Sequence, residues 1–362
     1  MDNEVITVKS VAWTYGLKAN TLQRNYKNVL SDFRTWDQKA HAEDYVLKPE
    51  NLGEQNGIDK SSLGDELYSI LHNKDGHGKK GSIIAIVKGT KPEVVAKIIN
   101  KISLESREKV KSVTMDLSDS MRSIASLCFP KARVTRDCFH VVKRGGEAID
   151  EIRMRYKREA VKNAKKEKAA YKRRQKRLRE QRKRYAEKMR KLHGGKWKKS
   201  SRGRKPEKLS KGFSPSRLLN GETLVEALTK CRIQFQKSRE KWTVNQEHRA
   251  GILFQMFPKL EEDYSLINDL RYIFKNKTLN KETAKERFEE WYKKVSQCTL
   301  REVKSVRDTI KYYEDEILNY FIEWETNASS ESLNSKIKVF RAEVKGVTDL
   351  PFFLFRVFTV LG

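Results

Sequence analysis

The chain has 362 residues and a formal net charge of +29 at pH 7. This length allows a sizeable core and two or three domains, and a basic surplus of this size points to a polyanion, most often nucleic acid. No apolar run is long enough to span a bilayer, and no charged leader precedes an apolar core, so we expect a cytoplasmic, nucleoid-associated protein with no membrane partner. The four cysteines lack zinc-site spacing, which argues against a zinc-finger DNA reader.

Residues 1–50 are expected to be helical and to bind DNA. A small residue, a turn residue and an apolar residue follow one another at the spacing of a helix-turn-helix, with Tyr15 and Leu17 available to fill its small core. The pattern consists of Ala12, Gly16 and Leu22. A second helix from about residue 20 would present Gln23, Arg24 and Lys27 to a groove or to phosphates. A helical hairpin that only packs on the core is an equal alternative.

Residues 51–150 read as the first part of an α/β core. Three β-type runs with glycine-rich turns are followed by a helix, a strand that ends at Asp116, a second helix and a fifth strand that ends at Asp137. The predicted elements are 58–59, 66–71, 82–87, 92–102, 110–115, 121–127 and 132–135. Their order is that of a ribonuclease-H-like fold with a mixed five-stranded sheet. An acid at the carboxyl end of a parallel strand lies where α/β sheets hold ligands, which makes Asp116 a candidate for chemistry.

Residues 151–320 are predicted to form a helical, strongly basic insertion. Its first part, 151–210, has 27 Lys plus Arg and 6 Asp plus Glu, and therefore carries 27 − 6 = +21 charges. An apolar residue every seven positions, from Tyr171 to Leu192, predicts one long helix. A basic loop at 200–206 is predicted to follow it. We expect a phosphate-binding arm rather than a merely solvated one. Its DNA-binding candidates are Lys172, Arg173, Arg174 and Arg177.

Residues 321–362 are expected to complete the core. Ser329 or Ser330 can cap a helix with Glu331 in its first turn, and Glu331, Asn334 and Lys338 share one helical face. Such a face can serve a metal and a phosphate together, although on its own it is equally an ordinary solvated face. Lys336 and Lys338 are candidates for phosphate contacts. The apolar run 351–361 is predicted to be a buried helix.

Three of these acids, Asp59, Asp116 and Glu331, together suggest a metal site. In a ribonuclease-H-like sheet the first and fourth strands are neighbours, so Asp59 and Asp116 can share a metal, with Glu331 on a helix packed across the sheet. Hard cations such as Mg²⁺ or Mn²⁺ prefer oxygen ligands. Two such ions about 4 Å apart can activate an attacking oxygen and stabilise a departing one in phosphoryl transfer.

At these residues the sequence resembles DDE transposases of bacterial insertion sequences, in particular the ISL-three-like, ISAon-type group. The motifs are Asn-Gly-Ile-Asp59, Thr-Met-Asp116, Phe-Pro130-Lys-Ala, Asp137-x-Phe-His140 and Asn327-Ala-x-x-Glu331-x-x-Asn334-x-Lys336-Ile-Lys338. The resemblance implies a ribonuclease-H-like core with a helical insertion. It also implies Mg²⁺-dependent cleavage and strand transfer at the ends of a mobile element. Asp59, Asp116 and Glu331 would be the catalytic, metal-binding triad, with Asp137 and His140 nearby.

Two departures from the family pattern keep alternatives open. Relatives commonly have a second acid directly after the first aspartate, where this chain has Lys60, so Asp65 stays a competitor for the first position. The N-terminal segment is short, so a separate small DNA-binding chain is a possible partner, besides double-stranded DNA and further copies of this chain bound to it. A structure-selective nuclease on the same core and a non-catalytic DNA-binding protein are the alternative functions.

Overall fold

The computed structural model describes residues 6–195, 212–343 and 349–362. The basic loop predicted for 200–206 therefore lies outside the described residues. The chain divides into two compact units. Unit 1 comprises 1–143, 272–292 and 307–362, and unit 2 comprises 144–271 and 293–306.

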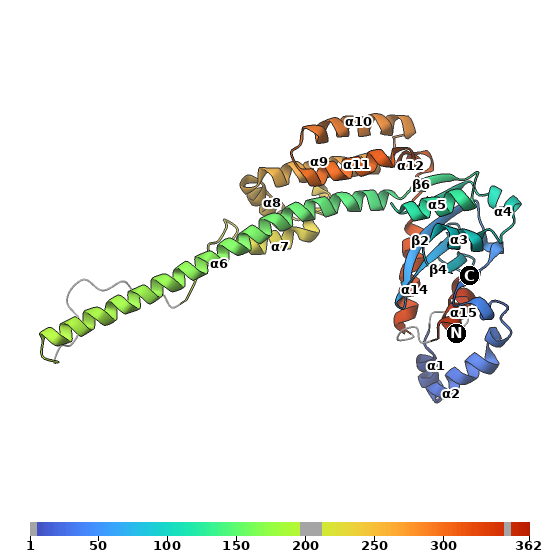
Figure 1. The fold of residues 1–362 in the computed structure, drawn as a ribbon, viewed down its shortest axis with the longest axis horizontal. Coiled ribbons are helices and arrows are strands. Elements are labelled where there is room, and N and C mark those ends of the chain that lie inside the picture. The colour runs from blue at the N-terminus through green and yellow to red at the C-terminus, as the bar shows by residue number, and fades with distance from the viewer. Residues whose placement is uncertain (1–5, 196–211, 344–348) are drawn as a thin grey trace. The chain divides into compact units, whose positions relative to one another are not determined.

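Unit 1 is built around a mixed six-stranded sheet (Figure 1). The strands are β1 (Tyr45–Leu47), β2 (Gln55–Leu63), β3 (Glu66–Asn73), β4 (Ile83–Lys88), β5 (Ser112–Met115) and β6 (Arg133–Arg136). Their order is β1-β4-β3-β2-β5-β6. β2, β3 and β4 form an antiparallel meander, and β5 and β6 run parallel to β2. The five predicted strands are confirmed. The short edge strand β1 was missed because three residues are too few to show a period.

Helices cover both faces of the sheet. Side chains alternate between the two faces along each strand, so apolar strands present an apolar surface on both sides. Ile58, Val113 and Met115 point to the face packed by α3 (Pro92–Ile99) and α5 (Asp119–Cys128). α4 (Leu104–Glu108) precedes β5. The other face packs against α14 (Ala328–Glu343) and α15 (Leu350–Leu361). α15 is the buried C-terminal helix that the sequence predicts.

The N-terminal segment forms two short helices, and the turns that follow them pack on the C-terminal helix. α1 (Val8–Thr14) and α2 (Ala19–Asn25) are separated by a turn in which Gly16 has a φ of +64°, and a π-helical turn follows at Tyr26–Leu30. The expected small core is wrong, because Tyr15 and Leu17 are 74% and 53% exposed. The segment instead buries Tyr26 and Phe33 against aromatic rings of α15, which offer more apolar area.

The regular elements described between β6 and α14 are all helices. Its helices are α6 (Cys138–Leu192), α7 (Leu224–Gln234), α8 (Val244–Met256), α9 (Pro258–Lys275), α10 (Lys281–Gln297), α11 (Arg301–Tyr312), α12 (Glu314–Leu318) and α13 (Tyr320–Glu323). Capping boxes at Thr223 and Thr243 fix the starts of α7 and α8. In unit 2 the ring of Phe235 lies 5.7 Å from those of Phe254 and Tyr264.

Two further observations concern the described residues. No helix there has the length and apolar character needed to cross a membrane. Cys128, Cys138, Cys231 and Cys298 are free thiols.

Candidate active site

Three aspartates lie at one level of the sheet: Asp116 and Asp137 follow the carboxyl ends of β5 and β6, and Asp59 lies beside them within β2. Ile58 of β2 pairs with Met115 of β5, and Met115 pairs with Arg136 of β6. The next residue on each strand is an aspartate, at positions 59, 116 and 137. Residues in register on parallel strands project to the same face. The predicted adjacency of the first and fourth core strands is confirmed, and it brings Asp59 beside Asp116.

Asp116 is held at both its carboxylate and its backbone. It is 8% exposed, and its Oδ1 accepts a hydrogen bond of 2.9 Å from the Ser118 N–H. Its Oδ2 lies 3.4 Å from Nζ of Lys60. Its carbonyl oxygen accepts a bond of 2.8 Å from the guanidinium of Arg136. The loop after β5 is therefore fixed, and so is the direction of this carboxylate.

Arg136 connects this loop to the returning helices. The residue is fully buried in β6, and its Nε donates to Glu316 of α12 at 2.6 Å. Its guanidinium lies 4.0 Å from the centre of the Tyr313 ring. A buried cation is stable only when it is well paired, and this one is bound to α12, to Tyr313 and to the Asp116 loop at once. Sequence reasoning missed Arg136, because no pattern distinguishes it from an exposed arginine.

Asp59 accepts hydrogen bonds both from its own strand and from α14. Its Oδ1 accepts from the Lys60 N–H at 2.8 Å, and its Oδ2 accepts from the side-chain amide of Asn334 at 2.6 Å. Burial raises the pKa of Asp59, the Lys60 N–H opposes this, and the neighbouring charge of Asp116 adds to the rise. The amide oxygen of Asn334 is buried without a hydrogen-bond partner. Two mutually repelling carboxylates and an unpaired amide oxygen thus lie together.

Glu331 lies about one turn before Asn334 on α14, and the side-chain amide of Asn334 contacts Asp59. Asn327, Glu331 and Asn334 are spaced at i, i+4 and i+7, so they share one side of the helix. The Asn327 N–H is 3.5 Å from Oδ1 of Asp137, and Asn334 contacts Asp59. The Glu331 side chain is exposed and has no hydrogen-bond or ion-pair partner among the described residues. No group of three or more His, Cys, Asp or Glu arranged to hold a metal occurs within those residues.

Asp137 and His140 form a pair beside the two other aspartates. Asp137 is 1% exposed, and its Oδ2 lies 3.1 Å from Nδ1 of His140 at the start of α6. The hydrogen bond to Asp137 raises the pKa of His140. Burial opposes the rise, and the charges of Asp137, Asp116 and Asp59 add to it. The half-buried imidazole therefore lies at the edge of an acidic site whose charges favour its protonated form.

The start of α14 is held against β2 and β3 by close packing. His72 of β3 is 1% exposed and lies 3.1 Å from the hydroxyl oxygens of both Ser329 and Ser330. Burial lowers the pKa of His72 to about 4. A Cβ at Gly57, the residue paired with His72, would lie 2.2 Å from Cε1 of that ring. Only glycine fits at this position.

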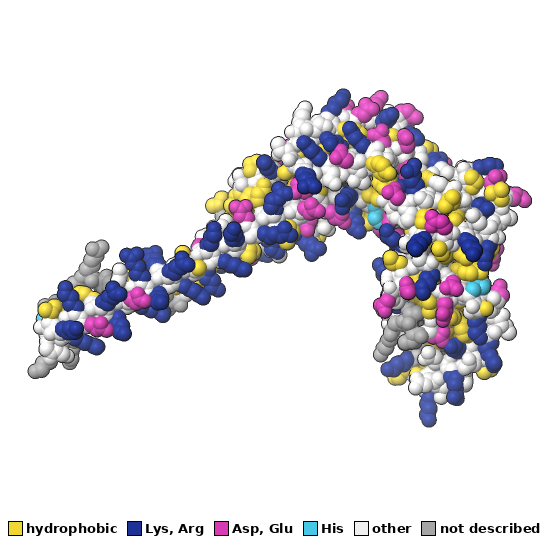
Figure 2. Space-filling model, in the orientation of Figure 1, with side chains coloured by type: hydrophobic (Ala, Val, Ile, Leu, Met, Phe, Trp, Pro, Cys, Tyr) yellow, Lys and Arg dark blue, Asp and Glu magenta, His cyan; other side chains and the backbone are white. Residues whose placement is uncertain are grey.

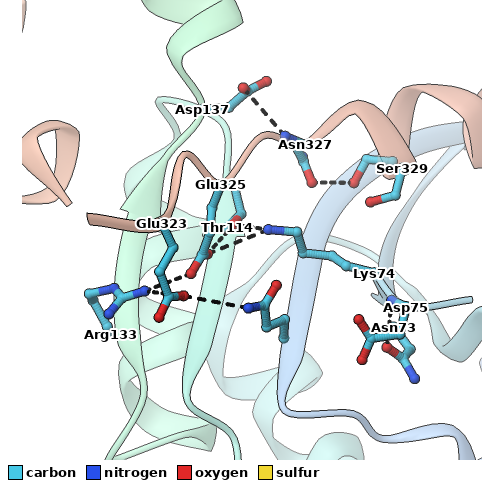
Figure 3. A network of polar contacts seen from close by, with 12 residues as sticks. Asn73, Lys74, Asp75, Thr114, Arg133, Asp137, Glu323, Glu325, Asn327 and Ser329 are labelled. Carbon is cyan, nitrogen blue, oxygen red and sulfur yellow. Dashed lines mark hydrogen bonds and ion pairs between the residues drawn. The ribbon is translucent and has the colours of Figure 1, made fainter. Parts of the chain in front are cut away.

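A second acid, Glu325, is buried just before α14 (Figure 3). Its side chain is 2% exposed and lies between Arg133 at 2.7 Å and Lys74 at 3.4 Å. Thr114 donates to it at 3.1 Å. Burial alone would raise the pKa of Glu325, but these cations and hydrogen bonds lower it. The negative charge of Glu325 is already balanced by these two cations, so we assign the residue a structural role. Sequence reasoning missed it because it stands outside any motif.

The remaining candidates near the aspartates have separate positions. Asp65 is exposed in the turn between β2 and β3, six residues and about 20 Å beyond Asp59 along the strand. The structure does not bring it to the site. Lys336 donates to the Gly78 carbonyl at 2.6 Å and so fastens α14 to the β3–β4 turn. Lys338 is exposed.

The predicted DNA-contacting residues differ in how accessible they are. Gln23 and Arg24 are exposed on α2, whereas Lys27 forms an ion pair with Asp349 and lies over the ring of Phe352. Phe213 packs on Tyr171 of α6. From there to its end no side chain of the helix is buried, and Figure 2 shows this part covered by Lys and Arg. We call residues 172–195 the distal arm. Its predicted DNA-binding members, Lys172, Arg173, Arg174 and Arg177, are all exposed.

Comparison with known proteins identifies the family. The model of the ISL3 type of DDE transposases, described as "Transposase", matches residues 57–202 and 207–357. Neither the curated proteins nor the solved structures give a match. The mixed sheet with its covering helices is compatible with the ribonuclease-H-like fold of such enzymes. Because the matched residues form most of the chain and contain the three in-register aspartates, this chain belongs to the ISL3-type transposase family.

Proposed function

We propose that this transposase cleaves DNA at the ends of its insertion sequence and joins them to target DNA, with Asp59, Asp116 and Glu331 as its catalytic residues. The observation that carries this is the parallel register of β2 and β5, which sets Asp59 beside Asp116 at the level where β5 ends. The flank of α14 supports the third member, because Glu331 lies between Asn327 and Asn334, whose partners are Asp137 and Asp59.

The donor set fits a hard divalent cation. DDE transposases generally use divalent metals. The carboxylates of Asp59 and Asp116 repel each other when both are charged. The amide oxygen of Asn334 is buried without a hydrogen-bond partner. Mg²⁺ or Mn²⁺ prefers this type of oxygen ligand. Asp59 and Asp116 would hold the metals, and Glu331 would complete the second of two sites. When bound, two such ions stabilise both the attacking and the leaving oxygens of an in-line displacement.

The protein's own groups would orient the reacting DNA. In the first step a water oxygen attacks the phosphodiester at the element's end and a 3′-hydroxyl leaves. In the second step that hydroxyl attacks a target phosphodiester, so one P–O bond forms as another breaks. Asn334 keeps Asp59 in place through its amide hydrogen bond. His140, which Asp137 holds at the rim of the site, could contact a DNA phosphate there when its imidazole is protonated.

DNA binding would be spread over several surfaces. Gln23 and Arg24 on α2 and Lys338 on α14 are exposed and can meet phosphates or base edges, and the distal arm adds a sequence-independent electrostatic contact. Lys27 and Lys336 contribute less, since each already has a partner in the fold. Transposition joins two ends, so we further propose that copies of this chain assemble on DNA. A separate small chain could supply additional end recognition.

The test is strand transfer of a labelled element end into a plasmid in the presence of Mg²⁺. Asp59→Asn, Asp116→Asn and Glu331→Gln should each lower joining by a factor of about 10² to 10⁴, because metal stabilisation of the transition state amounts to several kcal/mol. Asp65→Asn is the matched control and should join like the parent. Full joining by the Asp116→Asn protein would overturn the proposal.

The same experiment separates the alternatives. A structure-selective nuclease on this core would release cut ends without joined products. A non-catalytic DNA-binding protein would neither cut nor join, and divalent metal would have no effect on it. In that case deletion of the basic segment 151–210 should remove its measurable binding.

A further inference from the structure

Lys60 occupies an unusual position beside the two catalytic aspartates. β5 ends at Met115, so β2 has no neighbouring strand on that side beyond the level of Asp59. Lys60 is the next residue of β2, and its side chain passes over the end of β5 to reach Asp116. The ammonium lies 3.4 Å from Oδ2 of Asp116, and the Lys60 side chain is 44% exposed.

The charge of Lys60 opposes that of a metal at the same carboxylate. A carboxylate that binds a divalent ion cannot keep an ammonium at contact distance without strong repulsion between the two cations. The Lys60 ammonium is held by one ion pair that solvent can reach from the lysine side, and such ion pairs contribute little to stability. The ammonium can therefore be displaced at low cost, and it must be displaced when metal binds.

We propose that Lys60 is a resident counter-ion of the aspartate pair, which a divalent metal must displace and which a DNA phosphate then receives. This inference rests on the proposed metal site of Asp59 and Asp116. Without DNA, the ammonium neutralises Asp116 and weakens metal binding. With DNA, a phosphate offers the displaced ammonium a new partner. Metal and DNA consequently strengthen each other's binding through this side chain, and by thermodynamic linkage the effect is reciprocal.

The experiment measures Mn²⁺ affinity directly, by the electron paramagnetic resonance signal of free Mn²⁺, in the full-length protein without DNA. Lys60→Gln should bind Mn²⁺ about tenfold more tightly than the parent, because one positive charge near the ion is removed. Lys60→Arg keeps the charge and should retain the parent's affinity. Lys88→Gln is the control, since Lys88 has a similar exposure of 42% and a surface ion pair with Glu66. This variant loses the same charge and should bind like the parent.

A second measurement repeats the titration with a DNA duplex that carries an element end. In the parent, DNA should tighten Mn²⁺ binding, and this tightening should be smaller in Lys60→Gln than in Lys88→Gln. If Lys60→Gln binds Mn²⁺ no more tightly than the parent, including the case in which neither binds measurably, the inference is wrong. Unchanged Mn²⁺ binding in Asp116→Asn would instead overturn the proposed metal site, so the two failures are distinguishable.

Discussion

The level of the sheet at which β5 and β6 end carries few charged groups, and most of these have a defined partner within hydrogen-bond or ion-pair distance. The distal arm of α6 carries many cations, and none of its side chains is buried. At the sheet, function should depend on the geometry of single residues. Along the arm it should depend on total charge, because screened surface charges act collectively. The predictions that follow test this contrast, from the largest effect to the smallest.

Loss of Arg136 should give the largest loss of stability. Arg136→Met would leave the Asp116 carbonyl without its buried donor and remove one partner of Glu316, so we expect the free energy of unfolding to fall by about 3–5 kcal/mol. Arg122→Met is the matched control, since Arg122 contacts the same Glu316 but is 50% exposed. It should cost less than about 1 kcal/mol. Urea denaturation measures both, and equal losses would contradict the role given to burial.

A single methyl group added at Gly57 should also lower the stability of the fold. Gly57→Ala places a Cβ 2.2 Å from the His72 ring and 2.7 Å from the side-chain oxygen of Asn327, which should cost about 1–3 kcal/mol in unfolding free energy. The control is Gly251→Ala in α8, where no atom lies within 4 Å of the new Cβ. This change should stabilise the protein by about 0.5–1 kcal/mol, because alanine is the better helix former. Thermal melting gives the sign of each effect.

Charge removal in the distal arm should change the salt dependence of DNA binding and leave the fold intact. In a protein with Lys172, Arg173 and Arg177 all changed to Gln, the slope of log K against log salt should become shallower by up to about 2.7. The control changes Lys285, Arg287 and Lys293 of α10 to Gln and removes the same charge. Fluorescence anisotropy at several salt concentrations measures both, and an equal slope change in the control would show that only net charge matters.

The smallest effect concerns the titration of two histidines. The pKa of His140 should lie above its ordinary value, and Asp137→Asn should lower it, because the hydrogen bond to Asp137 is the main cause of the rise. His72 should titrate only at about pH 4, and it serves as the internal reference. The His140–Asp137 pair then stabilises the fold below the unfolded pKa of histidine, and this contribution disappears as pH rises through the folded pKa. Imidazole NMR signals measure both groups.

Much of the core could be predicted because its signals are local. The strands that carry Asp59 and Asp116 are short, apolar and bounded by turns, and the helices that follow them have a clear period. The carboxyl-end position of Asp116 follows from the order of strands alone. The N-terminal packing could not be predicted in the same way, because Tyr26 and Phe33 meet rings located at the other end of the chain.

The site could be predicted only in part, for a related reason. A motif indicates which acids belong together, but not which cations neutralise them. Glu325 and Arg136 lie outside any pattern, and their importance comes from burial, which arises only when α12, α14 and the sheet have assembled. Asp65 stayed a competitor for Asp59 because Lys60 departs from the family pattern, and the position of the β2–β3 turn separates the two residues.

The docking of α14 along β2 has a consequence for synthesis on the ribosome. Asn327 lies over Gly57, Asn334 reaches Asp59 and Arg341 reaches the carbonyl of Ser62, so the helix is laid lengthwise on a strand made long before it. A nascent chain therefore exposes both aspartates well before the helix that carries Glu331 emerges. The proposed site would be complete only after α14 has been synthesised and has docked on β2.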